Sequence, residues 1–208
     1  MKKILLLITF ALLACSNVIA QKDDMRLKYL NLGFPIMKTS MPNSPTLKSD
    51  IGISFTVGRT FLLHKKPIGN VLYFGIDATW FDINYTKYKL ESEDEMYDIC
   101  KYHQLEIGVQ VGPSLTIKPA KKLLIQGYFR YAPSYSILAS KEEESAHGNY
   151  ASMFVGGGSI SYGVISLGVE KRFGKSKYKD FIGIYDRGNS TSEKTKFSGI
   201  RIYLSFRF

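Results

Sequence analysis

Cysteine is scarce in this chain of 208 residues, which contains only Cys15 and Cys100. Cys15 lies in an N-terminal segment that we expect to be removed on export, so the mature protein would keep a single cysteine. An intramolecular disulfide is thereby excluded, although exported proteins meet an oxidising environment. We expect Cys100 to be a sheltered and inert thiol, because a reactive thiol needs an electropositive, partly exposed site.

Long apolar runs are also lacking. Residues 4–15 form a nearly unbroken apolar segment, which is too short to cross a bilayer as a helix. Lys2 and Lys3 precede it, and compact residues ending in Ala20 follow it, as in a secretory signal peptide. The sequence therefore predicts a signal peptide over residues 1–20 and one mature domain over residues 21–208. A lipoprotein acylated at Cys15 is the alternative, but Leu13 fits a lipobox poorly.

Acidic residues are few beside basic ones, with 18 Asp and Glu against 28 Lys and Arg, and the formal net charge is +10. An exported protein seldom meets nucleic acid, so we expect no nucleic-acid partner. Phosphates of outer-membrane lipids and lipopolysaccharide are the anionic neighbours that the charge favours. A surface charge that only keeps the protein hydrated is an equally good interpretation.

Alternation of apolar and polar residues with a period of two is abundant, and it predicts β-strands. It is clearest around Ile107, where apolar residues alternate with polar ones such as Glu106 and Gln110. The alternating segments are 30–36, 51–57, 72–80, 105–117, 123–135, 150–160, 165–173 and 200–208. We predict an all-β fold, an eight-stranded antiparallel up-and-down transmembrane β-barrel.

The less apolar face of these segments carries charges of both signs, interleaved with glycine. In a membrane barrel this face lines a narrow lumen, where opposite charges must satisfy each other and small residues relieve crowding. We predict a structural lumen charge network of Asp77, Glu106, Arg130, Glu170, Arg172, Arg201 and Arg207. Glu106 and Arg130 lie on one predicted hairpin, although a tight turn near Pro119 would place Arg130 opposite Gln110.

The predicted connections alternate in length. Short links fall at 64–70, 118–122 and 161–163, and long polar links fall at 37–49, 88–101, 139–149 and 174–196. Outer-membrane barrels have short periplasmic turns and long outer loops, so we expect both termini in the periplasm. Aromatic girdles are predicted from Tyr29, Phe61, Trp80, Phe81, Tyr85, Tyr131, Tyr135, Phe173 and Phe206. Pro113 and Pro133 predict a bulge or a local break in the strand ladder.

The C-terminus ends in an alternation that closes on an aromatic residue, with Ile202, Leu204, Phe206 and Phe208 on one face. This pattern resembles the C-terminal signature of bacterial outer-membrane proteins, which implies recognition by the barrel-assembly machinery. The stretches 64–67, 77–82, 111–114 and 131–134 look like small outer-membrane barrel proteins of Bacteroidetes. That resemblance implies fold and location over nearly the whole mature chain, and it transfers no functional residues.

No residue pattern identifies a catalytic, cofactor-binding or metal site, and we expect no cofactor. Lipid A deacylases and acyltransferases have a similar size, but such chemistry needs a nucleophile beside a base. The chain offers His64, His103 and His147 as bases. We expect His103 near the outer rim, facing lipid, and it lacks the serine two residues on that the deacylase pattern would supply.

Acidic residues cluster in two predicted outer loops, at 91–98 and 142–144, without the spacing of a calcium-binding EF-hand. We expect these loops to be solvated, and the last loop to be basic, with Lys175, Lys177, Lys179, Arg187, Lys194 and Lys196. The function that we predict is a structural or surface-interaction role, in which the loops contact surface lipids or a partner protein. The alternatives are a lipid-modifying enzyme of the outer membrane and a soluble periplasmic ligand-binding barrel.

Overall fold

The computed structural model describes residues 25–40, 46–89, 101–140, 146–178 and 193–208. The predicted signal peptide, Cys100 and the acidic loops lie outside these residues. The described chain is built of strands: β1 (Lys28–Ser40), β2 (Leu47–Ser49), β3 (Ile53–Leu62), β4 (Leu72–Lys89), β5 (Lys101–Ala120), β6 (Leu123–Ser140), β7 (Ala146–Tyr162), β8 (Ile165–Tyr178) and β9 (Glu193–Arg207). None of the described segments is a helix long and apolar enough to cross a membrane.

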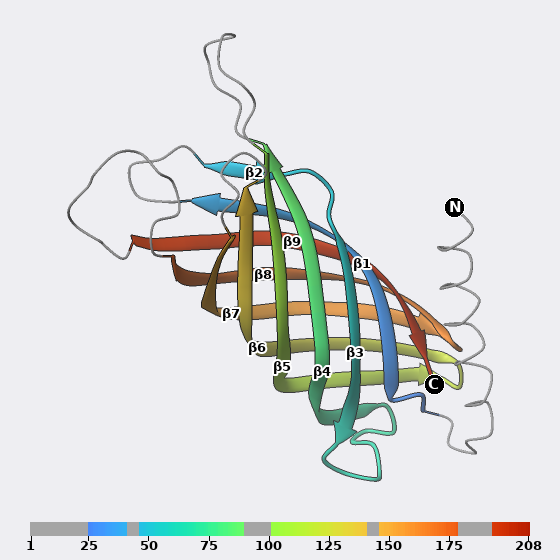
Figure 1. Ribbon diagram of the computed structural model, residues 1–208. Coiled ribbons are helices and arrows are strands. Elements are labelled where there is room, and N and C mark those ends of the chain that lie inside the picture. The colour runs from blue at the N-terminus through green and yellow to red at the C-terminus, as the bar shows by residue number, and fades with distance from the viewer. Residues whose placement is uncertain (1–24, 41–45, 90–100, 141–145, 179–192) are drawn as a thin grey trace, which may run out of the picture.

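The strands form one closed antiparallel ring (Figure 1). From β3 to β9 each strand pairs with the next strand in the chain, and β1 pairs with β9 to close the sheet. The backbones of Lys28 and Phe208 exchange two N–H···O bonds of 3.0 Å at this seam. β2 and β3 both lie between β1 and β4, so they are two parts of one barrel strand. The predicted all-β, eight-stranded, up-and-down barrel is confirmed.

The strands are longer than the alternation of the sequence predicted. β5 extends to Lys101 and β6 to Ser140, whereas the predicted segments covered 105–117 and 123–135. The alternation of buried and exposed positions continues through these extensions, but most outward residues there are polar or small, such as His103 and Ala139. At the other end, β5 and β6 are joined by two residues, as are β7 and β8, so these links are as short as predicted.

The strands are strongly staggered around the ring. Following paired residues once around the barrel from Lys38 leads back to β1 at Lys28, ten residues away. The path passes through Ser198, Phe173, Phe154, Tyr131, Val111, Ala78 and Arg59. A closed sheet with such a stagger has strands tilted by about 35–45° from the barrel axis, and the ribbons of Figure 1 run at a slant for this reason.

The outward face of the ring is apolar. Each of the eight barrel strands exposes large apolar side chains. They include Phe34, Ile53, Ile76, Val109, Phe129, Ile160, Leu167 and Ile202. Aromatic rings pack against each other on this face, with centroids 5.8 Å apart for Phe129 and Phe154 and 5.9 Å apart for Phe154 and Phe173. The apolar surface therefore forms a continuous outer band, while polar residues turn inward.

A β-bulge in β4 changes which side chains face inward. Val57 pairs with Phe81 and Gly58 pairs with Thr79, so Trp80 is an extra residue. Trp80 and Phe81 are both exposed, at 58% and 43%, and the alternation resumes with Asp82 facing the lumen. The bulge thereby adds a buried carboxylate that the simple alternation did not reveal.

Both prolines lie at the seam between β5 and β6. In the ladder between these two strands, Gly112 and Pro113 have no cross-strand partner on β6. Val109 and Gln110, which face the region of Pro133, have none either. β5 and β6 nevertheless continue through both prolines. The predicted local break in the ladder is confirmed, because a proline has no N–H to donate across the seam.

Two further details of the faces were resolved only by the structure. The glycine-rich β7 turns Met153 and Val155 inward and Phe154 outward. Tyr29 was predicted to belong to an outer aromatic girdle, and this prediction is wrong. Its side chain lies inside the barrel, with only 2% of its surface exposed. The reason is a polar partner, since its hydroxyl donates to Asp77 Oδ1 at 2.5 Å.

Candidate functional site: the lumen charge network

The lumen contains charged side chains of both signs in equal number among the described residues. The four carboxylates are Asp77, Asp82, Glu106 and Glu170, and the four guanidinium groups are those of Arg130, Arg172, Arg201 and Arg207. Each is nearly fully buried. A buried charge is costly unless it is paired, so this balance is what a closed, charged interior requires.

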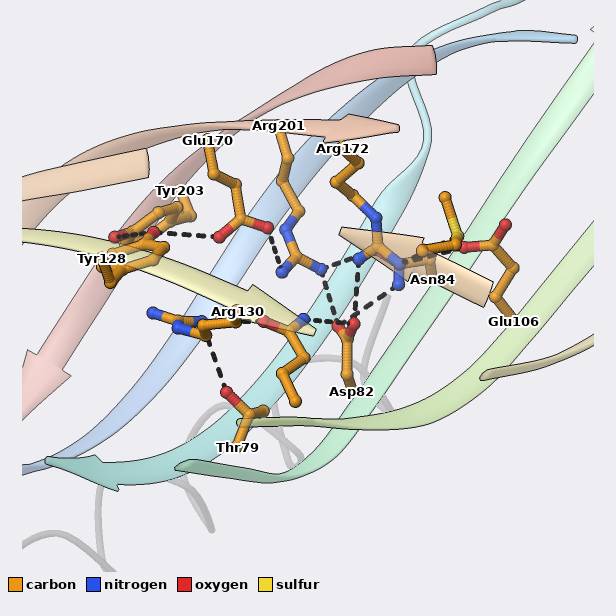
Figure 2. Close-up of polar contacts among 12 residues, drawn as sticks. Thr79, Asp82, Asn84, Glu106, Tyr128, Arg130, Glu170, Arg172, Arg201 and Tyr203 are labelled. Atoms are coloured by element: carbon orange, nitrogen blue, oxygen red, sulfur yellow. Dashed lines mark hydrogen bonds and ion pairs between the residues drawn. The ribbon is translucent and has the colours of Figure 1, made fainter. Parts of the chain in front are cut away.

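Asp82 is the centre of the network (Figure 2). Arg201 Nη1 donates to its Oδ1 at 2.7 Å, and Arg172 Nη1 donates to its Oδ2 at 2.9 Å. Gln110 donates to the same Oδ2 at 2.6 Å, and Asn84 donates to Oδ1 at 3.2 Å. Both oxygens of one carboxylate are thus fully used, by groups from β4, β5, β8 and β9.

The two arginines each bridge to a second carboxylate. Arg172 Nη2 pairs with Glu106 Oε2 at 3.2 Å, and Arg201 Nη2 pairs with Glu170 Oε1. Arg201 Nη1 also donates to Asn84 Oδ1 at 2.7 Å. The result is a chain of alternating charge in the order Glu106, Arg172, Asp82, Arg201 and Glu170.

Tyrosines continue this chain at Glu170. Tyr128 donates to Glu170 Oε2 at 2.9 Å, and its oxygen lies 2.8 Å from the hydroxyl of Tyr203. The Arg130 guanidinium stacks over the Tyr128 ring, 3.5 Å from its centroid. A guanidinium this close to an aromatic face gains a cation–π contact in addition to its ion pair.

A second cluster surrounds Asp77. Arg130 Nε lies 3.0 Å from its Oδ1, and Thr60 and Gln126 donate to its Oδ2 at 2.7 and 3.1 Å. Arg130 also donates to Gln110 Oε1 at 2.8 Å. Gln110 therefore links the clusters of Asp77 and Asp82 into one network.

Arg207 completes the interior near the C-terminus. Its Nε donates to Ser166 Oγ at 3.0 Å, and its Nη2 donates to Ser159 Oγ at 3.1 Å and to the amide oxygen of Gln126. No carboxylate is recorded within ion-pair distance of Arg207 in the described part of the chain. Neutral oxygens solvate this charge instead.

Glycines make room for these large side chains. A Cβ on Gly168 would collide with the ring of Tyr203, and a Cβ on Gly33 would collide with Ser54 and crowd Arg201. The glycines that the sequence places on the inward face therefore allow bulky groups on the facing strands.

Apolar side chains close the lumen at the end opposite the termini. Met37, Leu47, Tyr88, Tyr102, Leu138 and Phe197 face inward there and are buried in one cluster. The sequence predicted a polar lumen, and this apolar cluster departs from it. The departure arises because the strands extend beyond the predicted segments, into positions such as Tyr102 and Leu138.

All seven residues predicted for the lumen network lie inside the barrel, but their pairing differs from the contact that was considered. Arg130 pairs with Asp77 rather than with Glu106, and Glu106 pairs with Arg172. The turn falls at residues 121–122 rather than near Pro119, and Val111 pairs with Tyr131, so Arg130 does not lie opposite Gln110 as predicted. The long Arg130 side chain nevertheless reaches Gln110 Oε1. Asp82 was missed, and the adjacent aromatic residues Trp80 and Phe81 were the available sign of a phase change.

The histidines of the described chain make contacts of a structural kind. The ring of His103 is hydrogen-bonded to the Tyr85 hydroxyl, at 2.6 Å from Nδ1, on the outward face. His64 lies in the link between β3 and β4, where its Nε2 accepts from the Phe74 N–H at 2.9 Å. The hydrogen bonds found for these two rings include none to a serine. The side chain of His147 lies outside the described residues.

A metal site is not formed by the described residues, in which no three His, Cys, Asp or Glu side chains gather suitably. The carboxylates of the lumen are instead occupied by guanidinium groups and amides. The described charges of the lumen thus largely neutralise one another.

Comparison with known proteins gives structural likeness without sequence kinship. No family of known proteins matches the sequence, and no curated protein matches it. The chain is similar to the attachment invasion locus protein Ail of Yersinia pestis, at 7% identity over 88% of this chain and 100% of that chain, with a TM-score of 0.44. It is similar to Neisserial surface protein A, at 14% identity over 87% and 97% of the two chains, with a TM-score of 0.48.

The outer membrane protease OmpT from Escherichia coli is also similar, at 10% identity over 87% of this chain and 97% of that chain, with a TM-score of 0.47. At such identities these likenesses do not assign an activity to the chain. The resemblance to Bacteroidetes barrels stays a prediction.

Proposed function

We propose that this protein is an outer-membrane β-barrel whose closed scaffold anchors surface loops for contact with lipids or a partner protein. The single observation that supports it best is the inverted distribution of polarity. Charged residues such as Asp82 and Arg201 are buried, whereas large apolar residues such as Phe34 and Ile202 are exposed all around the ring. A soluble protein rarely exposes a continuous apolar belt of this kind, but hydrocarbon requires it.

Membrane location is tested by fractionation of cells and by migration on a denaturing gel with and without heating. We expect the protein in the outer-membrane fraction, with a faster band before heating because the closed barrel resists the detergent. Release as soluble periplasmic material would overturn the proposal in favour of a periplasmic ligand-binding barrel.

Orientation follows from the same proposal. We place both termini in the periplasm and the links between β1 and β2, β4 and β5, β6 and β7, and β8 and β9 outside. A protease added to intact cells should then cut in these links and leave the C-terminus intact. Cleavage confined to permeabilised cells would contradict this orientation.

The C-terminal residues are proposed to act as the signal for the barrel-assembly machinery. Phe208 lies at the closing seam, where its backbone bonds Lys28 and its side chain is half-buried, so part of the ring stays accessible to another protein. Phe208→Ala should therefore fold in detergent micelles like the native chain, but accumulate poorly in the outer membrane of cells. Equal loss in both settings would show that the ring serves the fold rather than recognition.

The contribution of the loops is tested by deleting residues 91–98, which lie outside the described residues. The described strands close the ring without them, so we expect insertion and heat-modifiable migration to persist while any surface contact is lost. Misassembly after this deletion would contradict the assignment of a surface loop.

A further inference from the structure

The outward face of the barrel carries a concentration of lysines at the rim that holds the proposed outer loops. Lys38, Lys48, Lys175 and Lys196 are exposed, and Lys87 is half-buried. We call these five residues the lysine arc. They come from β1, β2, β4, β8 and β9, which are neighbours in the ring, so the arc occupies one side of the barrel.

The strand register places these lysines side by side. Lys38 is the direct cross-strand partner of Lys48, and Lys175 is the direct partner of Lys196. Lys196 pairs with Ser40, two residues from Lys38 on the same face, which joins the two pairs into one row. Lys87 extends the row on β4. The partner of Lys48 on this strand is Lys89, which lies two residues from Lys87 along the strand.

Directly opposed like charges destabilise a strand pair. Two such pairs stand next to each other here, and no ion pair within the described chain involves any lysine of the arc. The outward carboxylate described at this rim is that of Asp50, which has its own interaction and cannot neutralise five cations. The arc is therefore arranged for an external anion with more than one negative charge.

The height of the arc identifies where that anion lies. Directly below it on the outward face are Ile36, Phe173 and Ile200, which belong to the apolar band. Lys171 is also exposed, four residues before Lys175 on the same face of β8, and pairs with Ile200. A lysine inside the band must extend its ammonium group up to the polar boundary, which brings a sixth cation to the arc.

The other side of the rim is different. At the corresponding ends of β5, β6 and β7, the outward side chains that the structure describes are His103, Tyr135 and Tyr150; the side chain of Lys101, at the end of β5, lies outside the described residues. A charge needed only for hydration would be spread around the ring. The lysines that the structure describes at this rim are gathered on the adjacent strands β8, β9, β1, β2 and β4, which favours a ligand that lies against this part of the barrel wall.

We propose that the lysine arc binds the phosphate groups of an outer-leaflet phosphoglycolipid of the lipid A type, whose acyl chains pack against the apolar band below. The proposal rests on the proposed function, which places this rim at the outer surface. Two phosphates on one headgroup match two adjacent lysine pairs, and the acyl chains match the exposed surface around Phe173 and Ile200. Attraction to phosphate at this boundary is electrostatic, so it should weaken with added salt.

The test uses the full mature chain folded in detergent micelles, with diphosphoryl lipid A, dephosphorylated lipid A and inorganic phosphate as probes. The arc variant is Lys38→Gln, Lys48→Gln, Lys175→Gln and Lys196→Gln together. The matched control removes the same charge from the opposite rim, where Lys65, Lys66, Lys121 and Lys122 are exposed in the short links. Heat-modifiable migration of each protein is recorded first, so failure of the barrel itself is seen separately from failure of binding.

We expect diphosphoryl lipid A to bind at least tenfold more tightly than dephosphorylated lipid A, and to lose at least tenfold in affinity with the arc variant. The control variant should change the affinity less than twofold. Without lipid A, the arc variant should resist urea at least as well as the native chain, because two repulsive pairs are gone. Equal binding of the dephosphorylated lipid, equal loss in both variants, or competition by inorganic phosphate at equal concentration would each overturn the proposal.

Discussion

The carboxylate of Asp82 shows how much a single residue contributes inside this barrel. It is 3% exposed and accepts hydrogen bonds from two arginines, a glutamine and an asparagine. Removing one member of a buried charge group leaves the others without compensation, which costs far more than the loss of a surface ion pair.

Asp82→Asn should therefore destabilise the folded barrel by about 3–5 kcal/mol, because Arg172 and Arg201 would face a neutral amide. Urea titration in micelles, followed by heat-modifiable migration, measures the change. Asp50→Asn is the matched control, since Asp50 is exposed and an exposed pair contributes about 1 kcal/mol or less. A similar loss in both variants would contradict the central role of Asp82.

Glu106 and Arg172 allow a double-mutant cycle. Arg172→Met and Glu106→Gln each break the 3.2 Å ion pair and leave the other charge buried. The double variant should lose less stability than the sum of the two single variants, by about 0.5–3 kcal/mol, because neither charge is then left without the other. Additive losses in urea titration would mean that the pair contributes nothing specific.

At the scale of elements, alternation in the sequence was enough to find every barrel strand, since one face must meet hydrocarbon or its equivalent and the other must not. The ends of the strands were not predictable in this way. Outside the apolar band, the outward face carries mostly polar or small residues and the inward face carries apolar ones such as Tyr102 and Leu138, so the alternation that marks a strand is lost while the hydrogen-bonded ladder continues. β5 and β6 illustrate this at Lys101 and Ser140.

The lumen charges were predictable as a set, and their partners were not. Alternation fixes which side chains point inward, but partners such as Asp82 and Arg201 are set by the stagger of distant strands. Asp82 itself was hidden because a single extra residue, Trp80, reverses the phase of the second half of β4. Counting positions across a bulge assigns every later side chain to the wrong face.

Deletion of Trp80 tests this account of the bulge. The deletion should join Thr79 and Phe81 in normal alternation and keep Asp82 inward, so the protein should still migrate as a heat-modifiable barrel. Deletion of Ile107 from the facing strand is the control, because it turns Glu106 toward the apolar band. If both deletions abolish the folded band, the bulge is required for closure and not only for phase.

At the scale of the whole molecule, inward side chains fill the interior of the barrel. Arginine, tyrosine and carboxylate side chains fill the middle of the lumen, and the cluster of Met37, Tyr88 and Phe197 fills the end opposite the termini. An eight-stranded ring of this kind has no room for a diffusion channel once its side chains are in place.

The native protein, reconstituted in a planar lipid bilayer, should accordingly give no stepwise current at voltages at which a porin in the same bilayer does. Urea-resistant, heat-modifiable protein recovered from the same preparation is the control for correct folding. Reproducible conductance steps from folded protein would show that the network opens, and would favour a pore over an anchoring scaffold.

The pairing of Asp82 with Arg201 joins residues 119 positions apart, and its pairing with Arg172 joins residues 90 positions apart. The cations on β8 and β9 are therefore the last to arrive when the chain is made and inserted in order. A chain without β8 and β9 would lack Arg172 and Arg201 and would leave Asp82 and Glu106 without their cationic partners. Because an unpaired buried charge is costly, we expect the interior to become stable only when the last two strands have joined the ring.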